Sequence, residues 1–216
     1  MFRVLIADDH PLFRAALRQV VETMFGEYDI LEASTLQEAE QAVHASPDLD
    51  LDLILLDLQM PGSTGFSGLV SLRNASPAVP IVVISAASTS ETMRSALTYG
   101  AAGFIPKSFS KDQIGEAVGR VLSGEVFLPG DALAGECRLD RAPPDRLRER
   151  ISALTQGELR VLDLLAKGKS NKIIAYELGI KESTVKAHIT AILRKLHVHS
   201  RTQAVIAARE LSFSTR

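Results

Sequence analysis

Hydrophobic residues follow two alternating patterns along the first half of the chain. Short apolar runs, bounded by charged or turn-forming residues, alternate with segments in which apolar residues recur at helical spacing. The runs predict strands that are buried on both faces, because their apolar residues are consecutive. The predicted strands cover residues 3–7, 28–33, 53–56, 81–84 and 104–105. The predicted helices cover residues 11–24, 35–44, 64–73, 92–99 and 110–123.

This repetition of strand and helix predicts the fold of the first half. Parallel strands joined by helical crossovers place helices on both faces of one sheet, and such crossovers are almost always right-handed. We therefore expect an α/β fold with a doubly wound, five-stranded parallel sheet. Sheets of this kind bind ligands at the carboxyl ends of their strands.

The pattern changes in the second half of the chain. Periodicity is lost after about residue 128, where proline, glycine and mixed charges are typical of a linker. Apolar spacing and capping residues then predict helices over residues 155–166, 170–178, 182–197 and 200–211. The chain is therefore expected to contain a sheet domain (1–125), a linker (126–150) and a small all-α domain (151–216).

Charge divides the chain at the same place. The net charge is −2, but residues 1–125 carry 8 basic and 16 acidic residues, whereas residues 126–216 carry 16 basic and 10 acidic residues. A basic domain can bind nucleic acid, and an acidic domain can hold a cation. The two domains are thus expected to have different partners.

Composition narrows the class of protein further. Apolar residues make up 46% of the chain and charged residues 23%, which is ordinary for a globular protein and argues against disorder. The single cysteine, Cys137, cannot form an intrachain disulfide, which favours a reducing compartment. No apolar run approaches the roughly 20 residues of a membrane span. We expect a cytoplasmic protein without a membrane partner.

Polar residues stand where four of the predicted strands end: Asp8, Asp9, Asp57, Ser85 and Lys107. The carboxyl ends of parallel strands share one edge, so these side chains are expected to converge. Three neighbouring carboxylates repel one another unless a cation lies between them, and such oxygen ligands suit Mg²⁺. The hydroxyl and the ammonium group would bind an anion. The pattern predicts a site for a metal-bound phosphoryl group, with Asp57 as the nucleophile.

The sheet domain resembles the receiver domain of response regulators, which has a flavodoxin-like fold. The resemblance rests on the acidic pair at residues 8–9, the hydroxyl at residue 85, and the segments DLQMPG (57–62) and GAAGFIPK (100–107). It implies that Asp57 accepts a phosphoryl group from a phosphohistidine on a sensor histidine kinase. It also implies that Asp9, Asp57 and the backbone carbonyl of Gln59 ligate Mg²⁺ directly, and that Asp8 acts mostly through water.

The same resemblance assigns the residues that respond to phosphorylation. Ser85 and Lys107 would bind the phosphoryl oxygens. Phe104 matches the switch aromatic of the family, which turns inward as the hydroxyl of Ser85 moves toward the phosphoryl group. On the residues alone, Phe104 could also be an ordinary core or surface residue.

In the all-α domain, the third predicted helix has the face that a DNA-recognition helix requires. One stripe is apolar and consists of Val185, Ile189, Ile192 and Leu196. The outward arc carries small and hydrogen-bonding residues, namely Lys186, Ala187, Thr190 and Arg194. A helix in the major groove reads base edges with such a face. The solvated face of a plain helical bundle is the alternative that this spacing leaves open.

This domain resembles the LuxR-type helix-turn-helix. The resemblance rests on the segments LTQGELRVL (154–162), GKSNKIIA (168–175) and STVKAH (183–188), followed by a Lys-Leu pair at residues 195–196. It implies that the residues facing the bases are Lys186, Ala187 and Thr190. It also implies contacts to the DNA backbone from Lys172, Thr184, His188 and Arg201. On the residues alone, His188 could equally be a packing residue.

The two resemblances, in this order, predict a two-component response regulator of the NarL/FixJ type and not an enzyme. Phosphorylation at Asp57 would control sequence-specific binding to double-stranded DNA and thereby transcription. The phosphorylated form is expected to be a homodimer, and RNA polymerase is a further candidate partner. One alternative is a receiver that signals through protein contacts. Another is a Mg²⁺-dependent phosphohydrolase, which is disfavoured because Gln59 stands where a second acid is needed.

Overall fold

The computed structural model describes residues 2–45, 51–130 and 149–213. The first half contains one parallel sheet with the strand order β2-β1-β3-β4-β5. The strands are β1 (Phe2–Ala7), β2 (Tyr28–Ala33), β3 (Leu53–Asp57), β4 (Ile81–Ser85) and β5 (Gly103–Pro106). The order reverses at β1, which is the switch point of a doubly wound sheet. The predicted α/β fold is confirmed.

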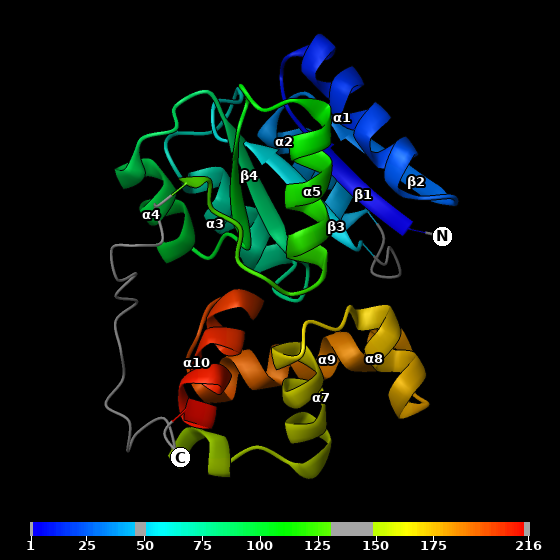
Figure 1. The fold of residues 1–216 in the computed structure, drawn as a ribbon, viewed down its shortest axis with the longest axis vertical. Helices are drawn as coiled ribbons and strands as arrows, with labels where there is room; N and C mark the ends of the chain where they lie inside the picture. The colour runs from blue at the N-terminus through cyan, green and yellow to red at the C-terminus, as the bar shows by residue number, and fades with distance from the viewer. Residues whose placement is uncertain (1, 46–50, 131–148, 214–216) are drawn as a thin grey trace.

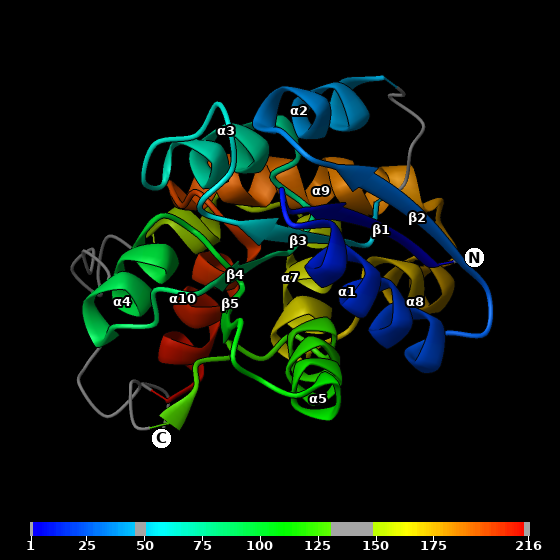
Figure 2. The same ribbon diagram turned by 90° about the horizontal axis from the view of Figure 1, so that it is seen from above.

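Helices cover both faces of this sheet (Figure 2). They are α1 (Pro11–Met24), α2 (Leu36–His44), α3 (Ser67–Ala75), α4 (Ser90–Thr98) and α5 (Lys111–Leu122). α1 and α5 share a core with Val4 and Ile6 of β1, whereas α2, α3 and α4 share a core with Leu5 and Ala7. Successive strand residues point to opposite faces, so burial of both faces explains the consecutive apolar runs in the sequence.

The helix that follows β3 begins later than the sequence predicted. α3 starts at Ser67 rather than at residue 64. Gly65 has a positive φ of 56°, and the Ser67 hydroxyl accepts a hydrogen bond from the backbone N–H of Thr64 at 2.9 Å. A glycine in this conformation followed by a serine turn delays the start of the helix.

A short segment after α5 attaches part of the predicted linker to the sheet. The backbone N–H of Phe104 donates to the carbonyl of Phe127 at 2.9 Å, and Phe127 forms a parallel bridge with Gly103. Phe127 and Leu128 are both buried. The first linker residues therefore lie along the free edge of β5. The remainder of the predicted linker, residues 131–148 with Cys137, lies outside the described residues.

The second half forms a helical domain around its own core. Its helices are α7 (Gln156–Ala166), α8 (Asn171–Leu178), α9 (Glu182–Leu196) and α10 (Arg201–Phe213). The four residues of the predicted apolar stripe on α9 are all 0% exposed, namely Val185, Ile189, Ile192 and Leu196. This confirms which face of the helix points inward and which points outward.

The helical domain lies against the amino-terminal edge of the sheet, opposite to the edge where the strands end (Figure 1). Lys186 Nζ is 3.4 Å from the carbonyl oxygen of Leu51, just before β3. Gln203 Nε2 is 3.4 Å from the carbonyl oxygen of Thr98, at the end of α4. Ala78, before β4, belongs to the core cluster of the helical domain. Among the described helices, none has the length and hydropathy needed to cross a membrane.

Candidate phosphorylation site and nucleic-acid interface

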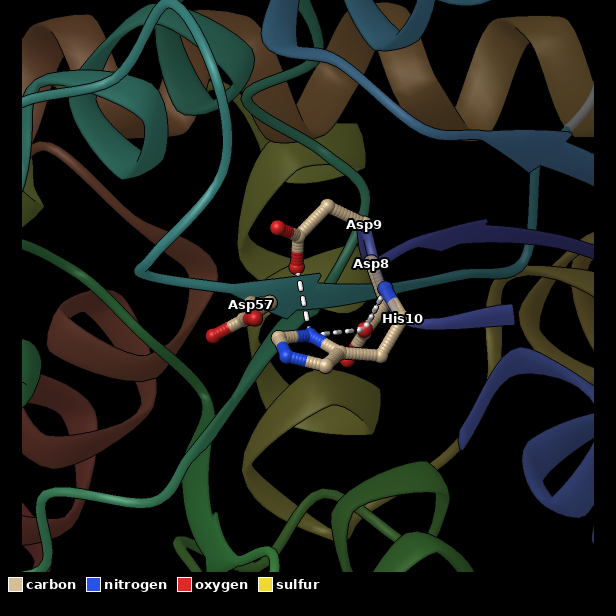
Figure 3. Close-up of side chains that lie close together, drawn as sticks. All are labelled: Asp8, Asp9, His10 and Asp57. Carbon is tan, nitrogen blue, oxygen red and sulfur yellow. Dashed lines mark hydrogen bonds and ion pairs between the residues drawn. The ribbon is translucent and has the colours of Figure 1, made fainter. Parts of the chain in front are cut away.

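Three carboxylates meet at the carboxyl-terminal edge of the sheet (Figure 3). Asp8 and Asp9 directly follow β1, and Asp57 is the last residue of β3. The side chains of Asp8 and Asp57 are each 1% exposed, and that of Asp9 is 31% exposed. One ligand atom from each of them, together with one from His10, lies within 4.8 Å of the others. The fold thus brings together the acidic residues that the sequence placed at strand ends.

His10 is a member of this cluster that the sequence reasoning missed. Its Nδ1 lies 2.6 Å from Asp9 Oδ1 and 3.4 Å from Asp8 Oδ1. Its backbone N–H donates to Asp8 Oδ1 at 2.8 Å. The available signal was its position directly after the acidic pair, where a short side chain-to-backbone turn brings the ring over the carboxylates.

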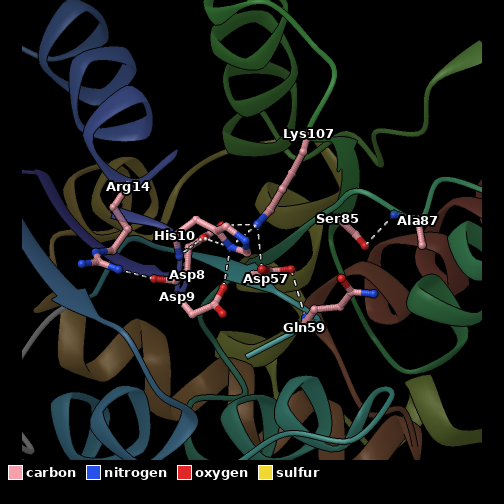
Figure 4. A network of polar contacts seen from close by, with 9 residues as sticks. All are labelled: Asp8, Asp9, His10, Arg14, Asp57, Gln59, Ser85, Ala87 and Lys107. Carbon is pink, nitrogen blue, oxygen red and sulfur yellow. Dashed lines mark hydrogen bonds and ion pairs between the residues drawn. The ribbon is translucent and has the colours of Figure 1, made fainter. Parts of the chain in front are cut away.

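Lys107 connects the end of β5 to the carboxylates (Figure 4). Its Nζ lies 2.7 Å from Asp57 Oδ2 and 2.8 Å from Asp8 Oδ2. Burial by itself would lower the pKa of Lys107, but the hydrogen bonds and charges of Asp57 and Asp8 outweigh this effect, and its pKa is raised. The ammonium group is therefore protonated at neutral pH and offsets part of the negative charge.

The remaining oxygen atoms of the cluster fit a divalent cation. Asp8 Oδ2 and Asp9 Oδ1 are buried and make no hydrogen bond among the described residues, although Lys107 and His10 lie at ion-pair distance. Buried carboxylate oxygens are costly unless they are paired or coordinate a cation. Hard carboxylate ligands with room for water are what Mg²⁺ prefers. The donor set is therefore suited to Mg²⁺.

The residues assigned to the phosphoryl group lie beside Asp57. The backbone N–H of Gln59 donates to Asp57 Oδ1 at 3.0 Å. Ser85 ends β4, and its hydroxyl accepts a hydrogen bond from the backbone N–H of Ala87 at 3.2 Å (Figure 4). Phe104 is already 0% exposed in this arrangement. Phe104 is thus buried while the Ser85 hydroxyl accepts a hydrogen bond from Ala87.

An open groove lies beside the acidic cluster. It is lined by His10, Leu12, Phe13, Gln59, Ala86 and Lys107. Leu12 is 89% exposed at its rim, on the first turn of α1. Two of the lining residues, Gln59 and Lys107, donate hydrogen bonds to the Asp57 carboxylate, so a second molecule in the groove would lie next to the partners of Asp57.

On α9, the structure places the predicted DNA-reading residues on the face away from the helical core. Ala187, Thr190 and Arg194 are exposed, whereas Lys186 is half-buried at the contact with the sheet domain. The hydroxyl of Thr190 donates to the carbonyl of Lys186 at 3.0 Å. The outward face therefore contains the side chains that base recognition needs, with one of them directed at Leu51.

Two family models match the chain. The response regulator receiver domain matches residues 4–119, and the luxR family of bacterial regulatory proteins matches residues 152–208. The chain belongs to the LuxR-type response regulators. Its first half is a receiver domain, and its second half is a LuxR-type DNA-binding domain.

Relatives match the chain over nearly its whole length. The chain is 44% identical over 218 residues to the glycerol metabolism activator of Pseudomonas putida, covering 99% of this chain and 98% of the relative. It is 35% identical over 206 residues to the nitrate/nitrite response regulator protein NarL of Escherichia coli, covering 94% and 93%. A solved LuxR family DNA-binding response regulator from Silicibacter pomeroyi matches at 38% identity with a TM-score of 0.52, covering 60% of this chain and 98% of that one.

Four residues predicted to contact the DNA backbone have different surroundings in the LuxR-type domain. Lys172 and Thr184 are exposed. His188 is half-buried and its ring packs next to Gly157, where an added Cβ would lie 3.4 Å from the ring atom Cε1. Arg201 is only 8% exposed and lies where the LuxR-type domain meets the receiver domain, lining a small cavity with Phe2 and Pro80.

Arg201 is held inside the LuxR-type domain by polar partners. Its Nη1 donates to Asn171 Oδ1 at 2.6 Å, and its Nη2 donates to the carbonyl of Lys169 at 2.5 Å. Burial lowers the pKa of Arg201 to about 10, so it remains charged at neutral pH. These contacts give Arg201 a structural role that the sequence did not reveal, because burial depends on how α8 and α10 pack.

Proposed function

We propose that this response regulator binds double-stranded DNA under the control of phosphorylation at Asp57 by a sensor histidine kinase. The observation that supports this most is the position of Asp57, buried at the carboxyl-terminal edge of the sheet, with Lys107 Nζ at 2.7 Å and with its partners Lys107 and Gln59 lining an open groove. The phosphohistidine of the kinase would enter this groove beside the exposed Leu12.

The chemistry is a transfer of a phosphoryl group between two nucleophiles. A carboxylate oxygen of Asp57 forms a bond to phosphorus while the bond between phosphorus and the histidine nitrogen of the kinase breaks. Lys107 offsets charge on the transferred group, and the Ser85 hydroxyl, which accepts from the backbone N–H of Ala87, donates a hydrogen bond to it. Asp8, Asp9, Asp57 and the backbone carbonyl of Gln59 would hold Mg²⁺. When bound, Mg²⁺ supplies positive charge to the phosphoryl oxygens.

Phe104 has a different role in this proposal from the one that its resemblance implies. It is 0% exposed while the Ser85 hydroxyl accepts from Ala87, so the change at Ser85 would alter the packing of a buried aromatic side chain rather than bury an exposed one. The response to phosphorylation would then pass through the position of β5, which carries both Phe104 and the residue before Lys107.

The LuxR-type domain would read DNA with the outward face of α9. Lys186, Ala187 and Thr190 would face bases, and the neighbouring residues that would contact phosphates are Lys172, Thr184, His188 and Arg194. Arg201, which is 8% exposed where the domains meet, would contact a phosphate only after the domains separate. Because Lys186 lies against Leu51, this face is partly covered by the receiver domain. Release on phosphorylation would uncover it, and two released copies would bind two half-sites as a homodimer. RNA polymerase is a further partner of the DNA-bound form. Because DNA and RNA polymerase are both partners, we expect the protein to be cytoplasmic.

Intact-mass measurement tests the phosphorylation step. With a small phosphodonor and Mg²⁺, the wild-type chain is expected to gain one labile phosphoryl group, which Asp57→Asn abolishes. Asp112→Asn, at an exposed acidic residue in the first turn of α5, is the matched control and should be labelled like wild type. Labelling of Asp57→Asn would refute the assignment, and multiple turnover on a small phosphoester would favour a phosphohydrolase.

Binding titrations test the DNA interface. Affinity is expected to fall steeply with salt, since Lys and Arg displace counterions from phosphates. Lys186→Ala should reduce discrimination between duplexes by about 1–3 kcal/mol, whereas Lys172→Ala should weaken binding to all duplexes alike. Equal binding of the phosphorylated protein to selected and random duplexes would contradict sequence recognition and favour signalling through protein contacts.

A further inference from the structure

Two helix-ending turns, one from each domain, meet at the interface between the receiver and the LuxR-type domain. Gly124 follows α5 and Gly168 follows α7, with positive φ angles of 84° and 77°. Each closes its helix with the same pair of hydrogen bonds, in which the glycine N–H and the next N–H donate to carbonyls of the last turn. Helices commonly end in this way, with glycine in the left-handed conformation.

The two turns are closer than any side chain would allow. A Cβ on Gly168 would lie 1.7 Å from the carbonyl oxygen of Ser123, and a Cβ on Gly124 would lie 2.4 Å from the Cα of Gly168. Both obstacles are backbone atoms, which cannot rotate away as the end of a flexible side chain can. The contact therefore requires glycine on both sides, independently of what the helix ends require.

We propose that this contact between Gly124 and Gly168 sets the docked position of the LuxR-type domain and thereby limits DNA binding by the unphosphorylated protein. The inference deepens the proposed function and rests on it, because it names the contact through which the DNA-reading face is held. Two polar contacts between the domains are longer, at 3.4 Å for Lys186 with Leu51 and for Gln203 with Thr98. The close approach of backbone at the two glycines is thus a specific feature of the interface.

Each turn is also connected to a functional site. Three residues beyond Gly124, Phe127 accepts a hydrogen bond from the N–H of Phe104 in β5, the strand that leads to Lys107. On the other side, the residue after Gly168 is Lys169, whose carbonyl accepts from Arg201. A shift of β5 would therefore move the Gly124 turn against a turn that is fixed within the LuxR-type domain.

Paired substitutions separate the docking contact from the local strain of placing alanine in this conformation. In the LuxR-type domain, Gly168→Ala is compared with Gly179→Ala, a helix-ending glycine at φ 65° with nothing within 4 Å of its Cβ position. In the receiver domain, Gly124→Ala is compared with Gly65→Ala, at φ 56° and also with nothing within 4 Å. Alanine is strained by the positive φ in both members of each pair. Only at Gly168 and Gly124 would its Cβ also collide with the other domain.

The measurements use the full chain without phosphodonor. Small-angle X-ray scattering reports the separation of the domains, and fluorescence anisotropy reports the affinity for a short labelled duplex of random sequence at low salt. Gly168→Ala and Gly124→Ala are expected to expand the molecule and to bind the duplex about fivefold more tightly than their controls. Gly179→Ala and Gly65→Ala are expected to match wild type in both measurements.

The outcomes distinguish this inference from the proposed function. If both glycine variants behave like their controls while phosphorylated wild type gains affinity, the docking inference is overturned and the proposed function stands. If the glycine variants gain affinity but phosphorylation changes nothing, the docking contact stands and the control by Asp57 is overturned. Should Gly168→Ala fail to fold, Gly124→Ala and its control decide the question alone.

Discussion

The two edges of the receiver sheet are built in opposite ways. The carboxyl-terminal edge gathers charged side chains, with Lys107 between Asp8 and Asp57 at 2.7–2.8 Å. At the amino-terminal edge, side-chain contacts such as Lys186 with Leu51 lie beside a close backbone contact that requires glycine at residues 124 and 168. The carboxyl-terminal edge depends on charge, and we call it the charge-specified edge. The amino-terminal edge depends on close packing, and we call it the shape-specified edge. A signal that passes between them would therefore be converted from a change in charge into a change in packing.

The largest expected effect concerns Arg201, which donates to the Lys169 carbonyl next to the Gly168 turn at the shape-specified edge. Arg201→Ala is expected to lower the free energy of unfolding of the LuxR-type domain by about 3 kcal/mol, because it leaves the buried Asn171 side chain and the Lys169 carbonyl without a donor. Chemical denaturation of the full chain measures this. Arg194→Ala, at an exposed position on α9, is the control and should change stability by less than about 0.5 kcal/mol. A similar small loss for Arg201→Ala would remove it as the support of the Gly168 turn.

The next effect concerns how α7, which leads to Gly168, is fixed to α9. Glu158 accepts from Lys195 Nζ at 2.7 and 3.0 Å and caps the start of α7. Burial alone would raise the pKa of Glu158, but Lys195 and the capping contacts outweigh this effect, so the pKa is lowered. A depressed carboxyl pKa contributes stability above the unfolded pKa, and that stability is lost as pH falls through the folded value.

Glu158→Gln is therefore expected to cost about 1.5 kcal/mol of unfolding free energy at neutral pH, with the difference from wild type shrinking below about pH 4.5. Denaturation at a series of pH values measures the two curves. Glu149→Gln, also acidic and just before the domain, should show no such convergence. Parallel curves for Glu158→Gln and wild type at all pH values would show that the ion pair contributes nothing.

At the charge-specified edge, the prediction is a loss of metal affinity. Asp9→Asn removes one of the carboxylates whose oxygen makes no hydrogen bond, so Mg²⁺ affinity is expected to fall about tenfold, or about 1.4 kcal/mol. Isothermal titration calorimetry measures it, and Asp29→Asn at the far end of β2 is the control. Unchanged affinity in Asp9→Asn would place the cation elsewhere.

The smallest expected effect is that of Gln203→Ala on affinity for DNA, and it tests whether polar contacts hold the domains together. Gln203→Ala removes a polar contact of 3.4 Å between the domains, and it is expected to change affinity for a random duplex by less than about twofold. Anisotropy titration of the unphosphorylated chain measures it beside Gly168→Ala. A larger effect for Gln203→Ala than for Gly168→Ala would mean that polar contacts, rather than close backbone packing, hold the domains together.

The contrast also explains how far sequence reasoning could reach. The sheet, its strand ends and the acidic cluster could be predicted, because apolar runs locate strands and parallel strands bring their ends together. The inward stripe of α9 followed from helical spacing in the same way. The burial of Arg201 could not be predicted, because it depends on contacts between residues that are distant in the sequence, which no local pattern indicates.

The docking contact could not be predicted for a different reason. Gly168 stands just after the predicted helix at residues 155–166, but a glycine required by a helix end and a glycine required by a neighbouring domain are identical in sequence. Only the position of Ser123 relative to Gly168 distinguishes them. Likewise, the delayed start of α3 depends on one turn at Gly65 that weakens, without abolishing, a helical pattern.

Hydrogen–deuterium exchange tests most directly whether a charge added at one edge loosens the other. The full chain is compared with and without a small phosphodonor in the presence of Mg²⁺, and the Asp57→Asn variant is treated in the same way. Exchange of the amides around Gly124 and Gly168 is expected to accelerate in the phosphorylated wild-type chain and to stay unchanged in the variant. A wild-type chain that carries the phosphoryl group but exchanges these amides at the original rate would contradict the account.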